Sequence, residues 1–209
     1  MRPLPNRVDP FGHLHAVSAR GLLMGNRGGR FHLPGQTLGN RRWDSRQWIA
    51  CVCEFKGRHR EVWKTGYTEL FFLDEVTALA AGHRPCFECR RADALAFQAF
   101  FGAGRMRAAE MDHVLHAERL AISRPLVHAP KDMPEGTVFA SGKGILAKRG
   151  AELLPWSFAG YGPPVEFGSG PLELLTPPAI VAVLARGYQP LWHRTAGQPF
   201  PGGAGFPAR

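Results

Sequence analysis

Short apolar and aromatic runs, separated by turn residues, predict a chain of brief strands and a few short helices. Residues 67–73 are aromatic and apolar enough for a buried strand. Residues 75–81 have helical composition, with Asp74 as the N-cap and Gly82 as the left-handed stop. Residues 90–101 and about 107–122 read as two further helices. The centre of the chain is therefore predicted to be a strand followed by three helices.

On either side of this centre the pattern is one of strands. Residues 47–55 form an apolar strand, which is predicted to turn at Lys56 to His59 and to return as residues 60–65. After residue 136 the pattern predicts four short strands and, behind Thr176-Pro177, a helix over residues 178–186. The four strands are residues 137–140, 145–148, 152–156 and 172–175.

Composition divides the chain into four segments. Residues 1–39 are basic and rich in glycine, and residues 40–122 hold the central strand and helices with a Cys-x2-Cys knuckle. Residues 123–197 follow a proline-bearing connector and form a small β module with a C-terminal helix, and residues 198–209 are a Gly/Pro tail expected to be disordered. The predicted fold class is α+β: a zinc-ribbon-like β-α unit with its knuckle, then a helix and the β module.

The four cysteines carry the first candidate chemistry. Cys86 and Cys89 are three residues apart at a predicted turn, a spacing that recurs in structural zinc sites. Cys51 and Cys53 lie two apart on a strand, so both could reach the same metal, with His59 and His83 as substitute ligands. Equally, Cys51 and Cys53 could be small buried hydrophobic residues. We therefore expect Zn²⁺ as a cofactor, with Cys86, Cys89, Cys51 and Cys53 as candidate ligands.

The segment around the knuckle resembles a known family. The run FFLDEVTALAAGHRPCFECRRAD is similar to the strand, helix and cysteine knuckle of the metal-binding domain of the Ada DNA-repair methyltransferase, and Arg42-Trp43-Asp44-Ser45 resembles the R-W-x-S that opens that domain. The resemblance covers about residues 42–93. It implies a bound metal, arginines that touch DNA phosphate around the knuckle, and a role in DNA repair.

One departure from that family changes what the resemblance implies. The Ada domain carries two cysteines as C-x3-C in a loop after its first strands, and one of them accepts a methyl group from DNA phosphate. The corresponding residues 56–60 contain no cysteine here. The resemblance therefore favours a structural metal site over methyl transfer to a cysteine.

Charge points to an anionic polymer as partner. The chain has 209 residues, 44% of them hydrophobic, and a formal net charge of +9. Residues 1–60 hold eleven Lys or Arg residues against three acidic ones, so most of the excess lies in the first third. Because arginine suits bidentate phosphate contacts, this distribution favours nucleic acid, with DNA preferred over RNA. The alternative is that the arginines only solvate a surface. The candidate contacts are Arg27, Arg41, Arg42, Trp43, Arg58, Arg84, Arg90 and Arg91.

A polar stripe on the helix of residues 107–122 is the second candidate chemistry. Asp112, His116 and Arg119 fall on one narrow face at 100° per residue. Asp112 could orient His116 for acid-base catalysis while Arg119 holds a phosphate or an oxyanion. Alternatively, an Asp-His pair at i,i+4 with an arginine beyond it only supports a helix surface.

Three functions remain open from the sequence. The first is a nucleic-acid-binding protein with a structural zinc knuckle, and the second is a hydrolase or lyase that acts on nucleic acid through Asp112, His116 and Arg119. The third is a metal-stapled protein-interaction domain. No run of 18 apolar residues and no signal-peptide pattern is present, so we expect a cytoplasmic protein without a membrane partner.

Overall fold

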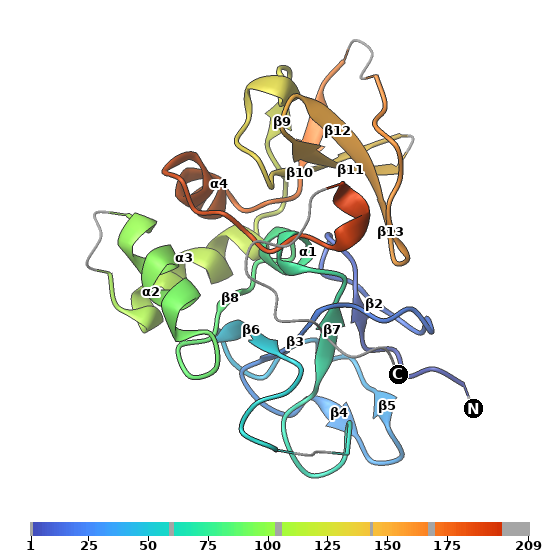
Figure 1. The fold of residues 1–209 in the computed structure, drawn as a ribbon. Coiled ribbons are helices and arrows are strands. Elements are labelled where there is room, and N and C mark those ends of the chain that lie inside the picture. Colours follow the sequence, from blue (N-terminus) through green and yellow to red (C-terminus); the bar gives the residue numbers. More distant parts are fainter. Residues whose placement is uncertain (1, 59–60, 103–105, 143, 167–169, 198–209) are drawn as a thin grey trace.

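The computed structural model describes residues 2–58, 61–102, 106–142, 144–166 and 170–197. Two six-stranded sheets form opposite ends of this part of the molecule, with helices between and beside them (Figure 1). The mixed α+β class predicted from the sequence is confirmed. The predicted disorder of residues 198–209 lies outside the described residues.

The first sheet is built from the first 85 residues and has the order β2-β1-β7-β3-β6-β8. Its centre is antiparallel, because β3 pairs with both β6 and β7, whereas β8 joins the edge of the sheet parallel to β6. The sheet takes strands from both sides of the compositional boundary at residue 39. Its strands are β1 (Arg7–Val8), β2 (Leu14–His15), β3 (Leu23–Arg27), β6 (Trp48–Val52), β7 (Leu70–Phe72) and β8 (Arg84–Pro85).

The second sheet is an antiparallel meander with two added strands, in the order β13-β12-β11-β10-β14-β9. A separate hairpin of β4 (His32–Leu33) and β5 (Thr37–Leu38) lies outside both sheets. The strands of the second sheet are β9 (Leu126–Val127), β10 (Val138–Ser141), β11 (Gly144–Arg149), β12 (Glu152–Ser157), β13 (Gly160–Tyr161) and β14 (Leu172–Leu174).

Four α-helices and two 3₁₀ turns occur in the described part of the chain. The Asp74 side chain caps α1 by accepting a hydrogen bond from the Thr77 N–H, and Gly82 follows with φ 79°, so the predicted cap and stop of this helix are confirmed. The elements are α1 (Glu75–Ala80), α2 (Arg91–Phe100), α3 (Ala108–Arg119), α4 (Pro178–Ala185), η1 (Pro130–Asp132) and η2 (Arg194–Ala196).

Apolar residues from distant parts of the chain share their cores. The C-terminal helix α4 buries Ile180 and Val183 in one cluster with Phe97 of α2 and Leu115 of α3. The helix α1 contributes Val76 to a second cluster that contains Val138 and Ala147 of the second sheet. The helical layer therefore connects the two sheets by direct packing.

The predicted hairpin after residue 56 is wrong for the residues that the structure describes. Residues 61–65 form turns, and β6 pairs with β3 and β8 instead. Trp63 has φ 61°, a left-handed conformation that does not fit a strand. Its backbone N–H donates to Glu69 Oε2 and its indole to the Glu69 carbonyl oxygen. These two bonds hold the buried indole in a turn.

Candidate functional site

Three of the four cysteines converge at the edge of the first sheet. Cys51 comes from β6, and Cys86 and Cys89 come from the turn between β8 and α2. The parallel pairing of β6 with β8 aligns Ala50 with Pro85, and the Cys86 N–H donates to the Ala50 carbonyl oxygen at 3.0 Å. As a result, the three Sγ atoms lie within 4.8 Å of one another. These cysteines are close enough to hold a metal ion.

The electrostatics of the thiols also suit a metal. Hydrogen bonds from Cys51 and Cys89 lower the pKa of Cys86. The pKa of Cys51 is raised by its hydrogen bond with Cys86 and by burial. The Glu88 N–H also points at Cys86 Sγ, at 3.4 Å. Negative charge on one sulfur is thus stabilised before any ion arrives, and the thiolate is the form that ligates metals.

The other predicted ligands do not join this group in the described residues. Cys53 follows the end of β6, where the regular alternation of the strand stops, and its thiol donates to the Leu22 carbonyl oxygen at 3.5 Å. His83 is fully buried and its Nε2 accepts from Arg27 Nε at 3.4 Å. His59 lies outside the described residues. Among the residues that the structure describes, the predicted ligands that come together are therefore Cys51, Cys86 and Cys89.

A cavity of about 210 Å³ adjoins the three thiols. Outward-facing residues of the first sheet, including Ile49 and Phe71, form one side of it. The Arg58 guanidinium, which also lines it, lies 3.0 Å from the carboxylate of Glu88 in the knuckle. The segment after β6 is therefore tied to the knuckle by an exposed ion pair.

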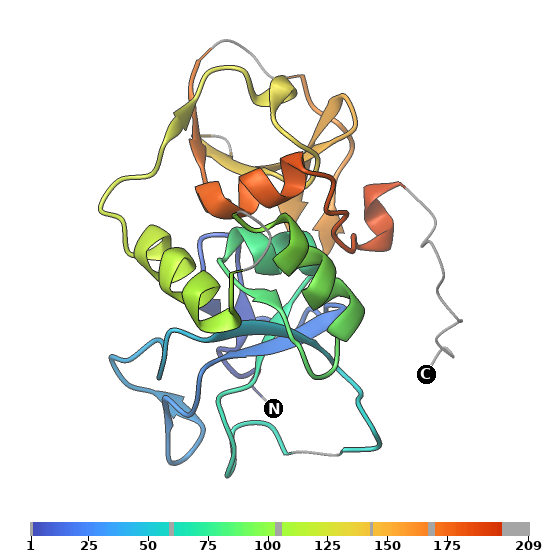
Figure 2. The ribbon, with the colours of Figure 1, turned by 90° about the vertical axis from the view of Figure 1, so that its left-hand side faces the viewer.

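A second cluster forms where residues 40–46 meet α3, beside the first sheet (Figure 2). The rings of Trp43 and His116 lie edge to face with centroids 5.7 Å apart. Arg119 Nη1 donates to the Arg46 carbonyl oxygen at 3.2 Å, and Arg46 Nη1 lies 2.9 Å from His113 Nδ1. The predicted stacking residue and two members of the predicted catalytic stripe are thus brought together.

Trp48, at the start of β6, lies between two arginines. The Arg27 guanidinium is 4.0 Å and the Arg119 guanidinium 4.3 Å from its ring centroid, which are cation-π distances. Burial and, for Arg27, the charge of Arg119 lower the pKa of each guanidinium to about 9. A Cβ at Gly82 would lie 2.8 Å from Arg119 Nε, so only glycine leaves room for this arrangement. Positive charges are therefore concentrated around one indole.

Several donors in this cluster have no hydrogen-bond partner among the described residues. They are Arg119 Nε, Arg119 Nη2 and, depending on its tautomer, His116 Nδ1. Partial burial and the charges of Arg119, Arg46 and His113 lower the pKa of His116. Because buried polar groups are normally satisfied, this combination of unpaired donors and excess positive charge favours an anionic ligand. We call Arg42, Trp43, Arg46, His113, His116 and Arg119 the basic aromatic cluster.

Asp112 takes no part in orienting His116. Its carboxylate accepts two hydrogen bonds from Arg84, at 2.9 Å from Nε and 2.8 Å from Nη2, and both side chains are buried. The predicted catalytic stripe is therefore divided, with a closed ion pair at one end and His116 and Arg119 at the other. The hydrolase or lyase hypothesis loses the carboxylate that was to orient its base.

Burial divides the predicted phosphate contacts into two groups. Arg27 and Arg84 are 1% exposed, and Arg90 is 7% exposed and paired with Glu75 and Asp93. These three guanidiniums stabilise the interior, because burying an arginine requires partners inside the protein. The side chains that remain on the surface are Arg41, Arg42, Arg58, Arg91 and the partly exposed Trp43.

Sequence reasoning missed two members of the cluster. Arg46 belongs to the same NRRWDSR run as Arg41 and Arg42, so its position beside Trp43 was a usable signal. His113 lies at the edge of the polar stripe of α3, and its contact with Arg46 depends on a tertiary arrangement that no local pattern shows.

Comparison with protein-family models, curated proteins and solved structures finds no match for this chain. The function must therefore be inferred from the geometry of its own residues. Within the described residues, no helix has both the length and the apolar character needed to cross a membrane.

Proposed function

We propose that this chain binds nucleic acid through the basic aromatic cluster and that a zinc ion at Cys51, Cys86 and Cys89 stabilises the sheet beside it. The observation that carries the proposal is the meeting of residues 40–46 with α3. It places His116 against the partly exposed Trp43 and joins Arg119, two of whose nitrogens have no partner among the described residues, to the Arg46 carbonyl oxygen. Guanidiniums bind phosphate and an indole stacks on a base, so this pairing suits a nucleotide chain.

The metal would act on this cluster through β6 and β8. Trp48 and Cys51 belong to the same strand, and His83, whose ring centroid lies 5.0 Å from that of Trp48, is three residues before Cys86. An ion that joins Cys51 to the knuckle would fix the pairing of the two strands. Zinc is the ion proposed, because a set of thiolates is its usual structural environment.

The binding proposal is tested with fluorescently labelled single- and double-stranded DNA and RNA oligonucleotides. Each phosphate contact is expected to contribute about one log unit of affinity per log unit of salt. The variants Arg42→Glu and Arg46→Glu should each weaken binding about tenfold and flatten the salt dependence. Lys131→Glu, an exposed change of the same charge in another part of the chain, is the matched control. A flat salt response of the wild type, or equal losses in all three variants, would overturn the proposal.

The metal proposal is tested by elemental analysis of the purified chain. We expect about one zinc ion per chain, lost in Cys86→Ser and in Cys51→Ser but kept in Cys53→Ser. Cys53 is the matched control because its thiol bonds to the Leu22 carbonyl oxygen outside the cluster. Native protein without metal, or a Cys53→Ser variant that loses as much zinc as Cys86→Ser, would contradict the assignment.

A further inference from the structure

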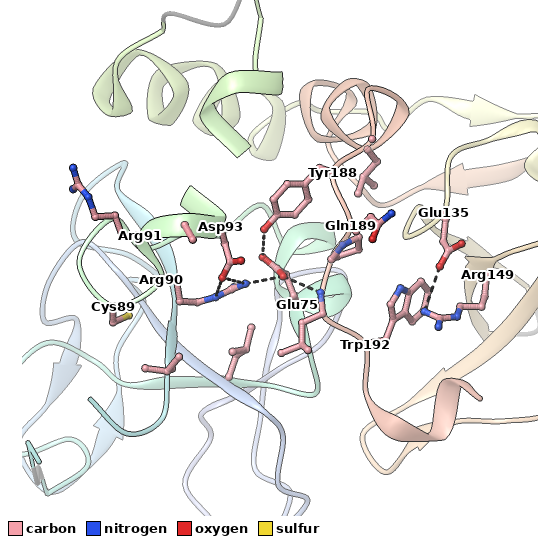
Figure 3. Close-up of a pocket in the computed structure, with 17 residues that line it drawn as sticks. Glu75, Cys89, Arg90, Arg91, Asp93, Glu135, Arg149, Tyr188, Gln189 and Trp192 are labelled. Atoms are coloured by element: carbon pink, nitrogen blue, oxygen red, sulfur yellow. Dashed lines mark hydrogen bonds and ion pairs between the residues drawn. The ribbon is translucent and has the colours of Figure 1, made fainter. Parts of the chain in front are cut away.

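A larger cavity, of about 930 Å³, also adjoins Cys89 (Figure 3) and shares Val52 and Cys89 with the cavity beside the three thiols. One wall is the beginning of α2, and another is the C-terminal segment of residues 187–192. Arg149 of β11 and Glu135 contribute from the second sheet and its approach. Leu23 and Val52 of the first sheet also line it, so the cavity lies where both sheets meet the helical layer, and it shares no residue with the basic aromatic cluster.

Free hydrogen-bond donors gather at the α2 end of this cavity. The N-cap residue, Arg90, makes no side-chain cap, so the N–H groups of the first helical turn are left without the partner that capping supplies. The Arg90 side chain is only 6% exposed, yet its Nη1 has no hydrogen-bond partner among the described residues. Figure 3 shows its guanidinium extending from the start of α2 towards the centre of the cavity. A helix N-terminus and an unpaired guanidinium nitrogen together favour an anion.

The acidic residues beside these donors are already engaged. Glu75 accepts from Arg90 Nη2 at 2.8 Å, from the Tyr188 hydroxyl at 2.7 Å and from the Leu191 N–H at 2.9 Å. Asp93 lies 2.9 Å from Arg90 Nε. The oxygens of Glu75 and Asp93 are therefore directed at Arg90, Tyr188 and Leu191, while Arg90 Nη1 makes none of these bonds.

The charged side chains that line the cavity balance, with Arg90 and Arg91 against Glu75 and Asp93 at the α2 end. Arg149 Nη1 pairs with Glu135 at 3.3 Å on the far wall. Arg91 is exposed at the start of α2 and has no ion-pair partner among the described residues. Arg91 would therefore add a positive charge near the end of the cavity that holds the unpaired donors.

Several apolar side chains of the lining set the shape of a ligand. Leu184, Pro190, Leu191 and Trp192 contribute to the wall. The volume is within the range of small-molecule sites, which combine an apolar lining with a few polar groups that fix orientation.

We propose that this cavity binds a small organic anion. Its carboxylate or phosphate monoester group would lie at the N-terminus of α2, within reach of Arg90 Nη1, and its apolar body would lie against Leu191 and Trp192. The site is independent of the nucleic-acid proposal, because the two share no residue.

The test uses calorimetric titration of the full chain with phenyl phosphate, benzoate, inorganic phosphate and benzyl alcohol. Phenyl phosphate or benzoate should bind at least about tenfold more tightly than either inorganic phosphate or benzyl alcohol, because only these two compounds combine an anionic group with an apolar ring. The comparison of phenyl phosphate with benzoate then distinguishes the two anionic groups. Equal affinity for benzyl alcohol, or no binding of either organic anion, would overturn the proposal.

Variants locate the site. Arg91→Glu is expected to weaken organic-anion binding about tenfold, because it reverses a charge at the helix N-terminus. Arg20→Glu, an exposed change between β2 and β3, is the matched control and should leave the affinity unchanged. Arg90→Gln should abolish binding, but it also leaves Glu75 without its ion pair. If Arg90→Gln does not fold, the comparison of Arg91→Glu with the control decides the test. Equal affinities of Arg91→Glu and Arg20→Glu would contradict the location.

The two proposals can fail separately. The variant Arg42→Glu should keep the wild-type affinity for the organic anion, and a saturating organic anion should leave oligonucleotide binding unchanged. Displacement of the oligonucleotide by phenyl phosphate would place both ligands at the basic aromatic cluster and would overturn the cavity site.

Discussion

The two ends of the polar face of α3 differ in how far their charged side chains are hydrogen-bonded. At one end Asp112 and Arg84 form a buried, bidentate ion pair that leaves the carboxylate fully engaged. At the other end Arg119 stacks on Trp48 with two nitrogens unpaired, and His116 has a buried ring nitrogen without a partner. The first end is a neutral and fully hydrogen-bonded pair, whereas the second carries excess positive charge and unsatisfied donors.

This difference separates stability from binding. Removing one partner of a satisfied buried pair strands a charge in the interior, which is costly. Removing an arginine whose donors are already unpaired relieves part of the cost that the protein carries without a ligand. We therefore expect mutations at the Asp112 end to lower the free energy of unfolding, and mutations at the Arg119 end to lower affinity.

The largest effect is expected from Asp112→Ala. It leaves Arg84 charged and buried, so the free energy of unfolding should fall by about 3–5 kcal/mol. Urea denaturation followed by circular dichroism measures this change. Asp132→Ala, at an exposed carboxylate, should stay within about 0.5 kcal/mol of the wild type.

A double variant refines this expectation. Replacing both partners, as Arg84→Met with Asp112→Leu, removes the stranded charge and should recover most of the lost stability. If the double variant were as unstable as Asp112→Ala, the cost would come from packing and not from charge.

The next effect is a pH dependence of stability that arises from His83, which lies beside Trp48 and Arg119. Burial and then the charges of Arg27 and Arg119 hold the pKa of His83 well below its ordinary value of 6.5. Below about pH 6.5 His83 is protonated in the unfolded chain but stays neutral in the folded chain. The free energy of unfolding should therefore fall as the pH falls below about 6.5. One such group contributes a slope of about 1.4 kcal/mol per pH unit.

His83→Gln should reduce this slope, measured by urea denaturation at pH 7.0, 6.0 and 5.5. His128→Gln, at an exposed histidine, is the control and should keep the wild-type slope. An unchanged slope in His83→Gln would show that other groups carry the pH dependence.

The smallest effect on stability is expected from Arg119→Gln. Because two of its nitrogens are unpaired, the free energy of unfolding should change by about 1 kcal/mol or less. Oligonucleotide affinity, measured by fluorescence anisotropy, should nevertheless fall about tenfold, the loss of one charge-assisted contact. A large loss of stability without loss of affinity would place Arg119 with Asp112 as a structural residue.

Local features of the fold were predictable, and long-range pairings were not. The cap at Asp74, the glycine after α1 and four of the six strands of the second sheet follow from residue type and short-range pattern, whereas β9 and β13 were not predicted. The hairpin after residue 56 failed because Trp63 is held by Glu69, a contact made by side-chain chemistry that strand propensity does not describe. The parallel pairing of β6 with β8 has no local signature, because the residues between them contain other elements.

The candidate site was predictable in the same uneven way. The spacing of Cys86 and Cys89 identified the knuckle, and the strand alternation brought Cys51 into consideration without separating it from Cys53. The buried arginines were not predictable, since Arg27 and Arg84 look in sequence like any surface cation. Only their tertiary partners, Gly12 and Asp112 among them, explain why they lie inside.

The strand β8 decides whether one edge of the first sheet is exposed. This two-residue strand ends at Pro85 and covers the free edge of β6. Without a metal at the thiols, β8 is still held by the buried ion pair of Arg84 with Asp112 and by the Cys86 N–H on the Ala50 carbonyl oxygen, so this edge of β6 stays covered. Loss of a metal alone is therefore not expected to expose the edge. Loss of the ion pair as well would make the backbone N–H and C=O groups of β6 available to another chain, so Asp112→Ala treated with a chelator should self-associate.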